Sequence, residues 1–217
     1  MYESNDSSES EVMPRRTWLR FSLRTTLAAM SFAGIGLYWF RNRLDAAALQ
    51  KETVRQLTAI GAHIGYRHEW DYKADRFSNS PPPGGKFLRS ILGDHFFVIP
   101  DIVLMDSFVG GTGTLAPLGN LKTVRLLGLT SSTIGDDEVT VLTKLTALED
   151  VSLYGTNVTD QELLRLASLP KLKNVVVTNS KVTDLGAAKF KELRPDCTLH
   201  YGYEADNAAV SPELQSK

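Results

Sequence analysis

A 24-residue repeat is the feature that most constrains the fold of this 217-residue chain. The segment that begins at Leu148 (LEDVSLYGTNVTDQELLRLASLPK) aligns without insertion with the segments that begin 24 residues before and after it, at Val124 and Leu172. A fainter unit precedes these three at the same step, and a final half-unit follows them. A regular period of this length is typical of solenoid proteins, in which each unit contacts its neighbours and stacked units share one core.

Each unit changes its apolar period part-way along. Val151 and Leu153 alternate with polar residues, which is the period of a β-strand. Further on, Leu163, Leu166 and Leu169 are spaced by three, which is typical of an α-helix or a 3₁₀ helix. One strand and one short helix cannot bury their apolar faces alone. We therefore expect the strands to stack as a parallel sheet and the helices to cover one side of it.

The start of each predicted helix carries polar residues suited to that place. Thr159 and Glu162 have the spacing of a capping box, with Thr159 as the N-cap. Asp136, Asp160 and Asp184 recur one residue after the cap position. A carboxylate there interacts favourably with the positive end of the helix dipole, by about 0.3–1 kcal/mol. This structural role is sufficient to explain the three aspartates, so they do not indicate catalysis.

Residues 148–153 (LEDVSL) have the LxxLxL pattern, and residues 154–160 (YGTNVTD) and 178–184 (TNSKVTD) continue it. In these segments the chain resembles the leucine-rich repeats of short bacterial membrane-anchored proteins, whose units read roughly L..L.LSGT.VTD.GL..L..L. The resemblance covers about residues 97–203. It implies an α/β leucine-rich-repeat solenoid, with a parallel sheet on the concave side and short helices on the convex side. It carries little information about activity.

The repeats also predict a set of turn hydrogen bonds. The position that such repeats usually fill with Asn holds Ser132, Thr156 and Ser180. We expect these hydroxyls to bond the turn backbone.

The residues before the repeats predict an N-terminal cap over residues 44–96, which protects the first edge of the sheet. Its expected elements are a helix ended by Gly61, a strand, a polar loop and a short helix before Gly93, at residues 44–60, 63–70, 71–86 and 86–92. The two ends, residues 1–14 and 204–217, are polar and are interpreted as disordered tails.

Residues 15–43 are predicted to form a membrane anchor. The uncharged run 25–40 would be about 24 Å long as a helix, which is short of a hydrocarbon core of about 30 Å. Measured from Trp18 to Trp39 the helix would be about 31 Å long, with aromatic residues at both ends. The pattern therefore predicts a transmembrane helix through residues 18–40.

Two alternatives to the anchor remain. Arg15 and Arg16 resemble a twin-arginine export signal, with a small-residue cleavage site near residues 46–48. The apolar run ends in residues 37–41 (LYWFR) rather than in small residues, which disfavours cleavage. A buried core helix is disfavoured by the flanking arginines. The numbers of flanking arginines and lysines before and after the uncharged run are equal, so they do not indicate the orientation of the helix in the membrane. The short N-terminal tail favours a repeat domain on the extracytoplasmic side.

Composition and motifs argue against several classes of protein. With a net charge of −1, the chain as a whole has no excess of positive charge to attract the phosphates of a nucleic acid. Cys197 is the one cysteine, so an intrachain disulfide is excluded. There is no phosphate-binding loop, Rossmann fingerprint or nucleophile elbow. We therefore expect no cofactor, no metal and no catalytic residue.

The histidines do not change that expectation. His63 and His68 are five residues apart in the predicted strand, so their side chains should point to opposite faces and cannot share a metal. The trio Ser152, Asp150 and His200 fails because His200 lies two strands away from Ser152, about 9.5 Å in backbone terms.

The outward-facing strand positions are the remaining candidate for function. We predict a partner-binding surface on the concave face, made by Ile102, Leu104, Leu126, Ser152, Tyr154 and Val176. Three of them should form an exposed apolar cluster at the N-terminal end of the sheet, namely Ile102, Leu104 and Leu126. The alternative is that loop 71–86 folds over this cluster.

The function predicted from these features is a membrane-anchored protein-interaction module without catalytic activity and with an unidentified protein partner. A module that binds a cell-envelope glycan or peptide is the alternative. That alternative requires aromatic stacking residues on the concave face, where only Tyr154 qualifies.

Overall fold

A computed structural model describes residues 23–71, 76–78, 80–109 and 114–203. The predicted tails, residues 1–14 and 204–217, lie outside these ranges. The chain divides into two compact units, Met1–Asn42 and Arg43–Lys217. The second unit contains the cap and all of the repeats.

The prediction of a transmembrane helix is wrong. Helix α1 (Leu23–Ala59) is long, but no helix among the described residues combines enough length with enough apolar character to cross a membrane. The uncharged run 25–40 has only 16 residues and includes glycine, serine and threonine, and α1 then continues into Arg41 and Arg43. Trp18, where the predicted span began, lies outside the described residues. The fold is thus corrected from a solenoid with a transmembrane helix to a mixed α/β fold with a six-stranded sheet.

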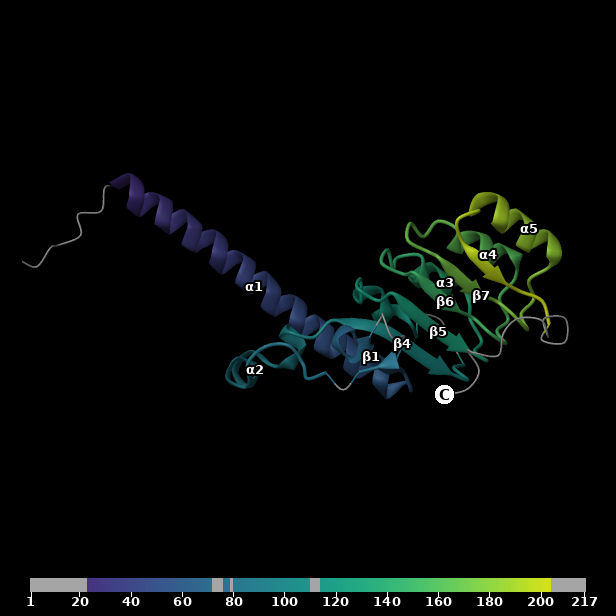
Figure 1. Cartoon of the computed structure of the whole chain (residues 1–217), viewed down its shortest axis with the longest axis horizontal. Helices are drawn as coiled ribbons and strands as arrows, with labels where there is room; N and C mark the ends of the chain where they lie inside the picture. Colours follow the sequence, from purple (N-terminus) through teal and green to yellow (C-terminus); the bar gives the residue numbers. More distant parts are fainter. Residues whose placement is uncertain (1–22, 72–75, 79, 110–113, 204–217) are drawn as a thin grey trace, which may run out of the picture. The chain divides into compact units, whose positions relative to one another are not determined.

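The six-stranded sheet has the strand order β1-β4-β5-β6-β7-β8 (Figure 1). Its strands are β1 (His63–Tyr66), β4 (Pro100–Asp106), β5 (Leu126–Thr130), β6 (Asp150–Ser152), β7 (Asn174–Val176) and β8 (Thr198–His200). The last five strands are parallel, and β1 is antiparallel to β4. The pairing joins residues that are 24 apart, as in Leu127↔Val151↔Val175. This register agrees with the columns predicted from the repeat.

The helices of the repeats lie along one side of the sheet (Figure 1). They are α3 (Asp136–Leu142), α4 (Asp160–Leu166) and α5 (Asp184–Leu193), and the fainter first unit has the 3₁₀ helix η3 (Ala116–Asn120) instead. Each of the three α-helices begins at the predicted aspartate. Thr159 is the N-cap of α4, and its backbone N–H donates to Glu162 at 2.9 Å, as the capping-box prediction requires.

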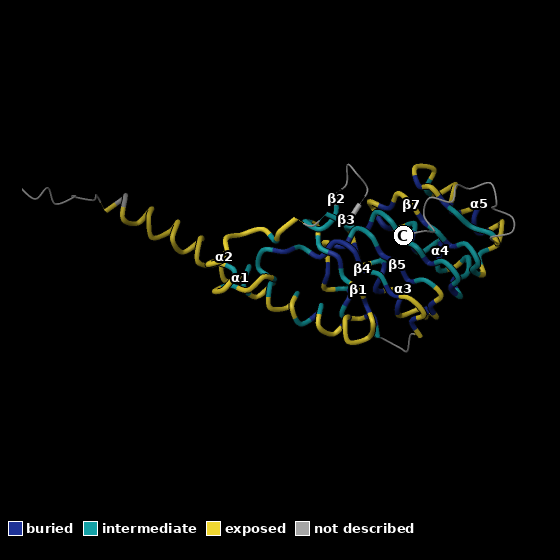
Figure 2. Tube along the Cα trace, turned by 60° about the horizontal axis from the view of Figure 1, so that its bottom comes forward, coloured by how far each residue is buried: buried dark blue, intermediate teal, exposed yellow. Residues whose placement is uncertain are grey.

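The core lies between the sheet and these helices. The residues that alternate toward the helices, in the strands and directly after β6 and β7, are at most 8% exposed, and Figure 2 shows this buried layer running along the strands. They are Val103, Met105, Leu127, Leu129, Val151, Leu153, Val175, Val177 and Leu199. On the helices, Leu142, Leu166 and Phe190 are fully buried. The period of the apolar residues therefore predicted both layers of the core.

Each unit turns after its strand through one residue with positive φ. These residues are Ser107, Ser131, Gly155 and Asn179, with φ of 54°, 51°, 67° and 57°. Each of them donates its backbone N–H to the adjacent unit, for example Ser131 to the Tyr154 carbonyl at 2.7 Å. Glycine and asparagine accept this conformation readily, whereas serine does so at a cost.

The hydroxyls of Ser132, Thr156 and Ser180 bond the turn backbone, as predicted. The three bonds run from the Phe108 N–H to Ser132 Oγ (3.1 Å), from Thr156 Oγ1 to the Leu153 carbonyl (2.7 Å) and from the Val182 N–H to Ser180 Oγ (3.3 Å).

The first edge of the parallel strands is covered by β1, in the place predicted for the cap. The strand ends at Tyr66 instead of residue 70, because the pairing register shifts after Gly65 and sets Tyr66 opposite Pro100. Proline has no N–H to donate, so the antiparallel ladder stops there. Helix α1 ends at Ala59, two residues before Gly61, which has a φ of 91°.

The remaining cap elements are short. They are the 3₁₀ helices η1 (Arg67–Glu69) and η2 (Asp94–Phe96), the strands β2 (Trp70–Asp71) and β3 (Arg76–Phe77), and the helix α2 (Lys86–Leu92). Strands β2 and β3 pair as a separate two-stranded sheet. The bounds of α2 agree with the prediction.

Candidate functional site

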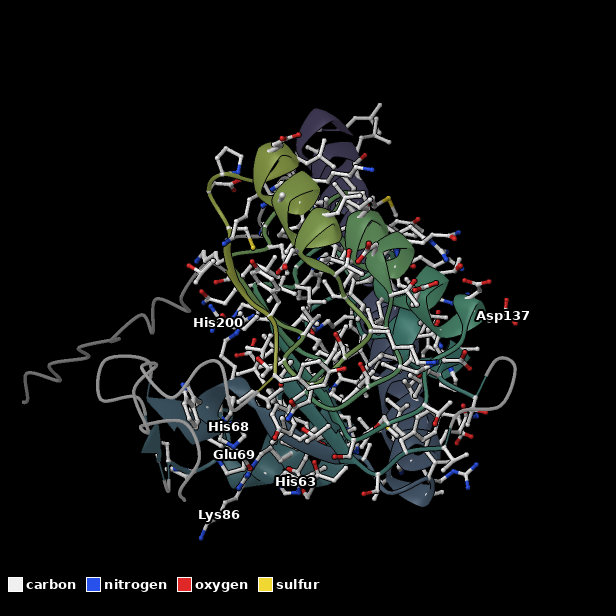
Figure 3. The ribbon with its side chains drawn as sticks, turned by 90° about the vertical axis from the view of Figure 1, so that its right-hand side faces the viewer. His63, His68, Glu69, Lys86, Asp137 and His200 are labelled. Carbon is white, nitrogen blue, oxygen red and sulfur yellow. The ribbon has the colours of Figure 1, made fainter. Side chains whose placement is uncertain are left out.

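The open face, which is the face of the sheet opposite the repeat helices, carries two columns of side chains. The columns are Ile102, Leu126, Asp150, Asn174 and Thr198, and Leu104, Gly128, Ser152, Val176 and His200. Strand residues alternate between faces, so these positions point away from the buried columns. In Figure 3, His200 and Asp137, at the start of α3, lie on opposite sides of the repeat unit.

Ile102 does not belong to an exposed cluster, and that prediction is wrong for this residue. Its side chain is only 4% exposed. Strand β1 sets Gly65 directly opposite Ile102, and a Cβ on Gly65 would lie 3.2 Å from the Ile102 Cβ. Ile102 thus packs against the backbone of β1. The prediction that loop 71–86 covers the cluster involves residues 72–75 and 79, which lie outside the described residues.

Leu104 and Leu126 are half-buried and remain on the open face. Leu104 lies over the neighbouring strand, since a Cβ on Gly128 would come within 2.9 Å of its Cδ2 atom. Gly128 therefore leaves the space in which the Leu104 side chain rests. The two leucines form a small, partly exposed apolar area on β4 and β5.

The C-terminal part of the open face is more polar. Ser152 and Val176 are half-buried, and the Asn174 amide donates to the Asp150 carboxylate. Tyr154 lies in the turn after β6 rather than in the strand. Its hydroxyl accepts a hydrogen bond from Asn179 Nδ2 at 2.8 Å, so the ring is tied to the next unit.

A ladder of alternating charge runs across the N-terminal ends of the strands, and the sequence reasoning missed it. Its members are Asp101, Arg125, Glu149 and Lys173, spaced by 24 residues. Arg125 donates to both carboxylate oxygens of Asp101, at 3.1 and 3.2 Å, and lies 3.7 Å from Glu149. Lys173 lies 2.7 Å from the other Glu149 oxygen. Reading this column along the repeat would have revealed the alternation.

The ladder changes the titration of its members. The hydrogen bond to Asp101 raises the pKa of Arg125 above its ordinary value. The hydrogen bond from Lys173 lowers the pKa of the Glu149 carboxyl, against the opposing effect of burial. Both shifts keep the groups charged over a wider range of pH.

Other hydrogen bonds join neighbouring units through their turns and helices. The Asn157 side chain bonds both backbone groups of Ile134. Its Oδ1 accepts from the Ile134 N–H at 2.7 Å, and its Nδ2 donates to the Ile134 carbonyl at 3.0 Å. The Asp160 carboxylate accepts from the N–H and the hydroxyl of Thr183, at 2.8 and 2.7 Å. Arg194 donates to the backbone carbonyls of Ala167 and Leu169 in the preceding unit, and to that of Leu172 at the start of its own unit. These bonds fix neighbouring units relative to one another.

The register of the strands does not place a histidine beside Ser152, as a serine nucleophile would require. Its neighbour on the next strand is Val176, and His200 follows one strand further on. Contrary to the prediction, His63 and His68 do not share one strand, because β1 ends before His68, which lies in η1. Across the described ranges, no three His, Cys, Asp or Glu side chains gather closely enough to hold a metal ion.

No protein-family model matches the chain, and no curated protein is significantly similar to it. The geometry therefore defines the class of protein: an α/β repeat protein whose sheet leaves one face partly exposed.

Proposed function

We propose that the repeats, residues 97–203, form a protein-interaction module that binds a protein partner through the open face and has no catalytic activity of its own. The observation that carries the proposal is the mixture of side chains on that face. The half-buried Leu104, Leu126 and Val176 lie beside polar groups on strands of one sheet. Partly exposed apolar side chains surrounded by polar ones are typical of protein-binding surfaces.

The bonds between units support the same proposal. Arg125, Asn157 and Asp160 each connect one unit to the next, so the open face is already ordered before a partner binds. A preorganised surface loses less conformational entropy on binding than a mobile one does.

A glycan-binding or peptide-binding module is less well supported. Stacking on a sugar requires a free aromatic face, and Tyr154 is half-buried in a turn with its hydroxyl bonded to Asn179. We therefore keep this alternative only as one outcome of the capture experiment.

The experiment compares partner capture by the intact chain and by Leu104→Lys and Leu126→Lys variants. Both substitutions place a charge in the apolar area without removing core volume. If the open face is the docking site, each should weaken capture about thirtyfold, the equivalent of about 2 kcal/mol. Gln161→Lys is the matched control, because Gln161 is exposed on α4. It should leave capture unchanged.

Melting temperatures distinguish the possible outcomes. Weakened capture with an unchanged melting temperature supports the proposal. Unchanged capture with a lowered melting temperature contradicts it, and indicates that another part of the chain packs on these leucines. Retention of an envelope glycan without any protein partner would favour the alternative module.

A further inference from the structure

Helix α2 is the α-helix among those described that buries none of its residues. Four of its seven residues are apolar: Phe87, Leu88, Ile91 and Leu92. The first three are 75%, 49% and 63% exposed. The repeat helices behave differently, since Leu142 of α3 and Leu166 of α4 are fully buried. Figure 2 shows α2 as an exposed segment.

The residues of α2 are arranged as on an amphipathic helix. At about 100° per residue, the four apolar residues occupy one continuous arc of about 140°, and Lys86, Arg89 and Ser90 occupy the rest. A helix of two turns is marginal by itself in water and normally forms because its apolar face is covered. Among the residues that the structure describes, none covers the apolar arc of α2 in the way that an ordered short helix normally requires.

The charges around α2 indicate what kind of surface could cover it. Lys86 is exposed and points away from the body of the molecule in Figure 3. Asp94 lies 3.7 Å from Arg89, so this pair is neutral as a whole.

The segment after α2 is tied to α1, which adds further cations. Arg43 donates to the Phe96 carbonyl at 3.1 Å, and Gln50 donates to the Val98 carbonyl at 3.0 Å. Residues 43–51 and 86–97 together carry four arginines and lysines against two aspartates, although the whole chain has a net charge of −1. The surroundings of α2 are thus locally cationic.

We propose that α2 binds an anionic lipid surface, with Phe87, Leu88 and Ile91 inserted among the acyl chains and Lys86 at the headgroups. Phe and Leu on one face with Lys and Arg on the other are typical of helices that lie in a membrane interface. The cationic surroundings complement lipid phosphate. This binding needs no membrane-spanning helix, and it uses a surface separate from the open face.

The test uses the full chain with an environment-sensitive fluorophore attached at Ser90→Cys. Ser90 is exposed, whereas Cys197 is buried and its pKa is raised by that burial, so labelling should select the new thiol. A local probe is needed because α1 has exposed apolar side chains of its own. The probes are phosphatidylcholine vesicles with and without phosphatidylglycerol.

We expect a blue shift of the emission with the phosphatidylglycerol vesicles and a much smaller one with phosphatidylcholine alone. The double substitution Phe87→Ser and Ile91→Ser should weaken this response about tenfold. The matched control is Leu185→Ser with Leu193→Ser on α5, which removes apolar side chains that are 63% and 61% exposed and should change nothing.

Three results would overturn the proposal. The first is unchanged emission in chains that sediment with the vesicles. The second is an equal response to both kinds of vesicle. The third is a blue shift that appears without lipid and grows with protein concentration, which would show that a second copy of the chain covers α2.

Discussion

Arg125 binds the fully buried carboxylate of Asp101 with two hydrogen bonds, although the two residues are 24 positions apart in the sequence. Arg67, which follows β1, donates to the same carboxylate at 3.2 Å. One buried anion thus joins the cap to the first two strands of the repeats. Since the side chain of Asp101 has no exposed surface, these two guanidinium groups replace the hydrogen bonds that water would make to a carboxylate.

Arg125→Met should destabilise the repeat unit by about 2–4 kcal/mol, because among the described residues it leaves the buried Asp101 carboxylate with Arg67 as its one charged partner. Chemical denaturation would measure this loss. Adding Asp101→Leu to Arg125→Met removes the buried charge as well, and should restore part of the stability. A double variant less stable than Arg125→Met would show that the carboxylate is not the source of the loss.

Leu153→Asp should severely destabilise the chain, whereas Ser152→Asp should change its stability by no more than about 0.5 kcal/mol. Leu153 is fully buried in the core, and the adjacent Ser152 is half-buried on the open face. Thermal melts of the two variants provide the comparison. Similar melting temperatures would contradict the assignment of the two faces.

Gly186→Ala should destabilise α5, although replacing glycine by alanine inside a helix usually stabilises it by about 0.5–1 kcal/mol. A Cβ at this position would overlap the Asp160 carboxylate, which bonds Thr183. We expect a net loss of about 1–2 kcal/mol in the free energy of unfolding. In an Asp160→Ala background the same substitution should cost less, which a double-mutant cycle measures. Additive losses would rule out the overlap as the cause.

The contribution of Glu149 to stability should depend on pH. Because the hydrogen bond from Lys173 lowers its pKa below the ordinary value of 4.5, the folded state is stabilised relative to the unfolded state above that pH. The contribution should disappear as the pH falls through the lowered pKa of the folded state. Denaturation of the wild type and Glu149→Gln between neutral and acidic pH would measure it. The stability difference should be largest near neutrality, and a constant difference would contradict the ladder.

Much of the repeat architecture could be predicted because each unit places the same residue type in the same environment. Val151 and Leu153 alternate with polar residues, and their counterparts 24 residues away are apolar too. Several units thus predict the same strand register, so an atypical residue in one unit hardly affects it. The aspartates at the helix starts are equally local features, because Asp136 and Asp160 each lie in the first turn of their own helix. Local periodicity therefore determined the strands, the helices and the two layers of the core.

Features that depend on distant segments could not be predicted in this way. The burial of Ile102 results from an antiparallel strand at residues 63–66, and the end of that strand depends on the position of Pro100 across the sheet. The repeat period does not predict the pairing of the cap strand with β4, because the cap does not share the 24-residue step. The outward column position of Ile102 was determined by the sequence. Its removal from solvent was decided by the tertiary structure, because burial depends on what packs against a side chain as well as on the direction in which it points.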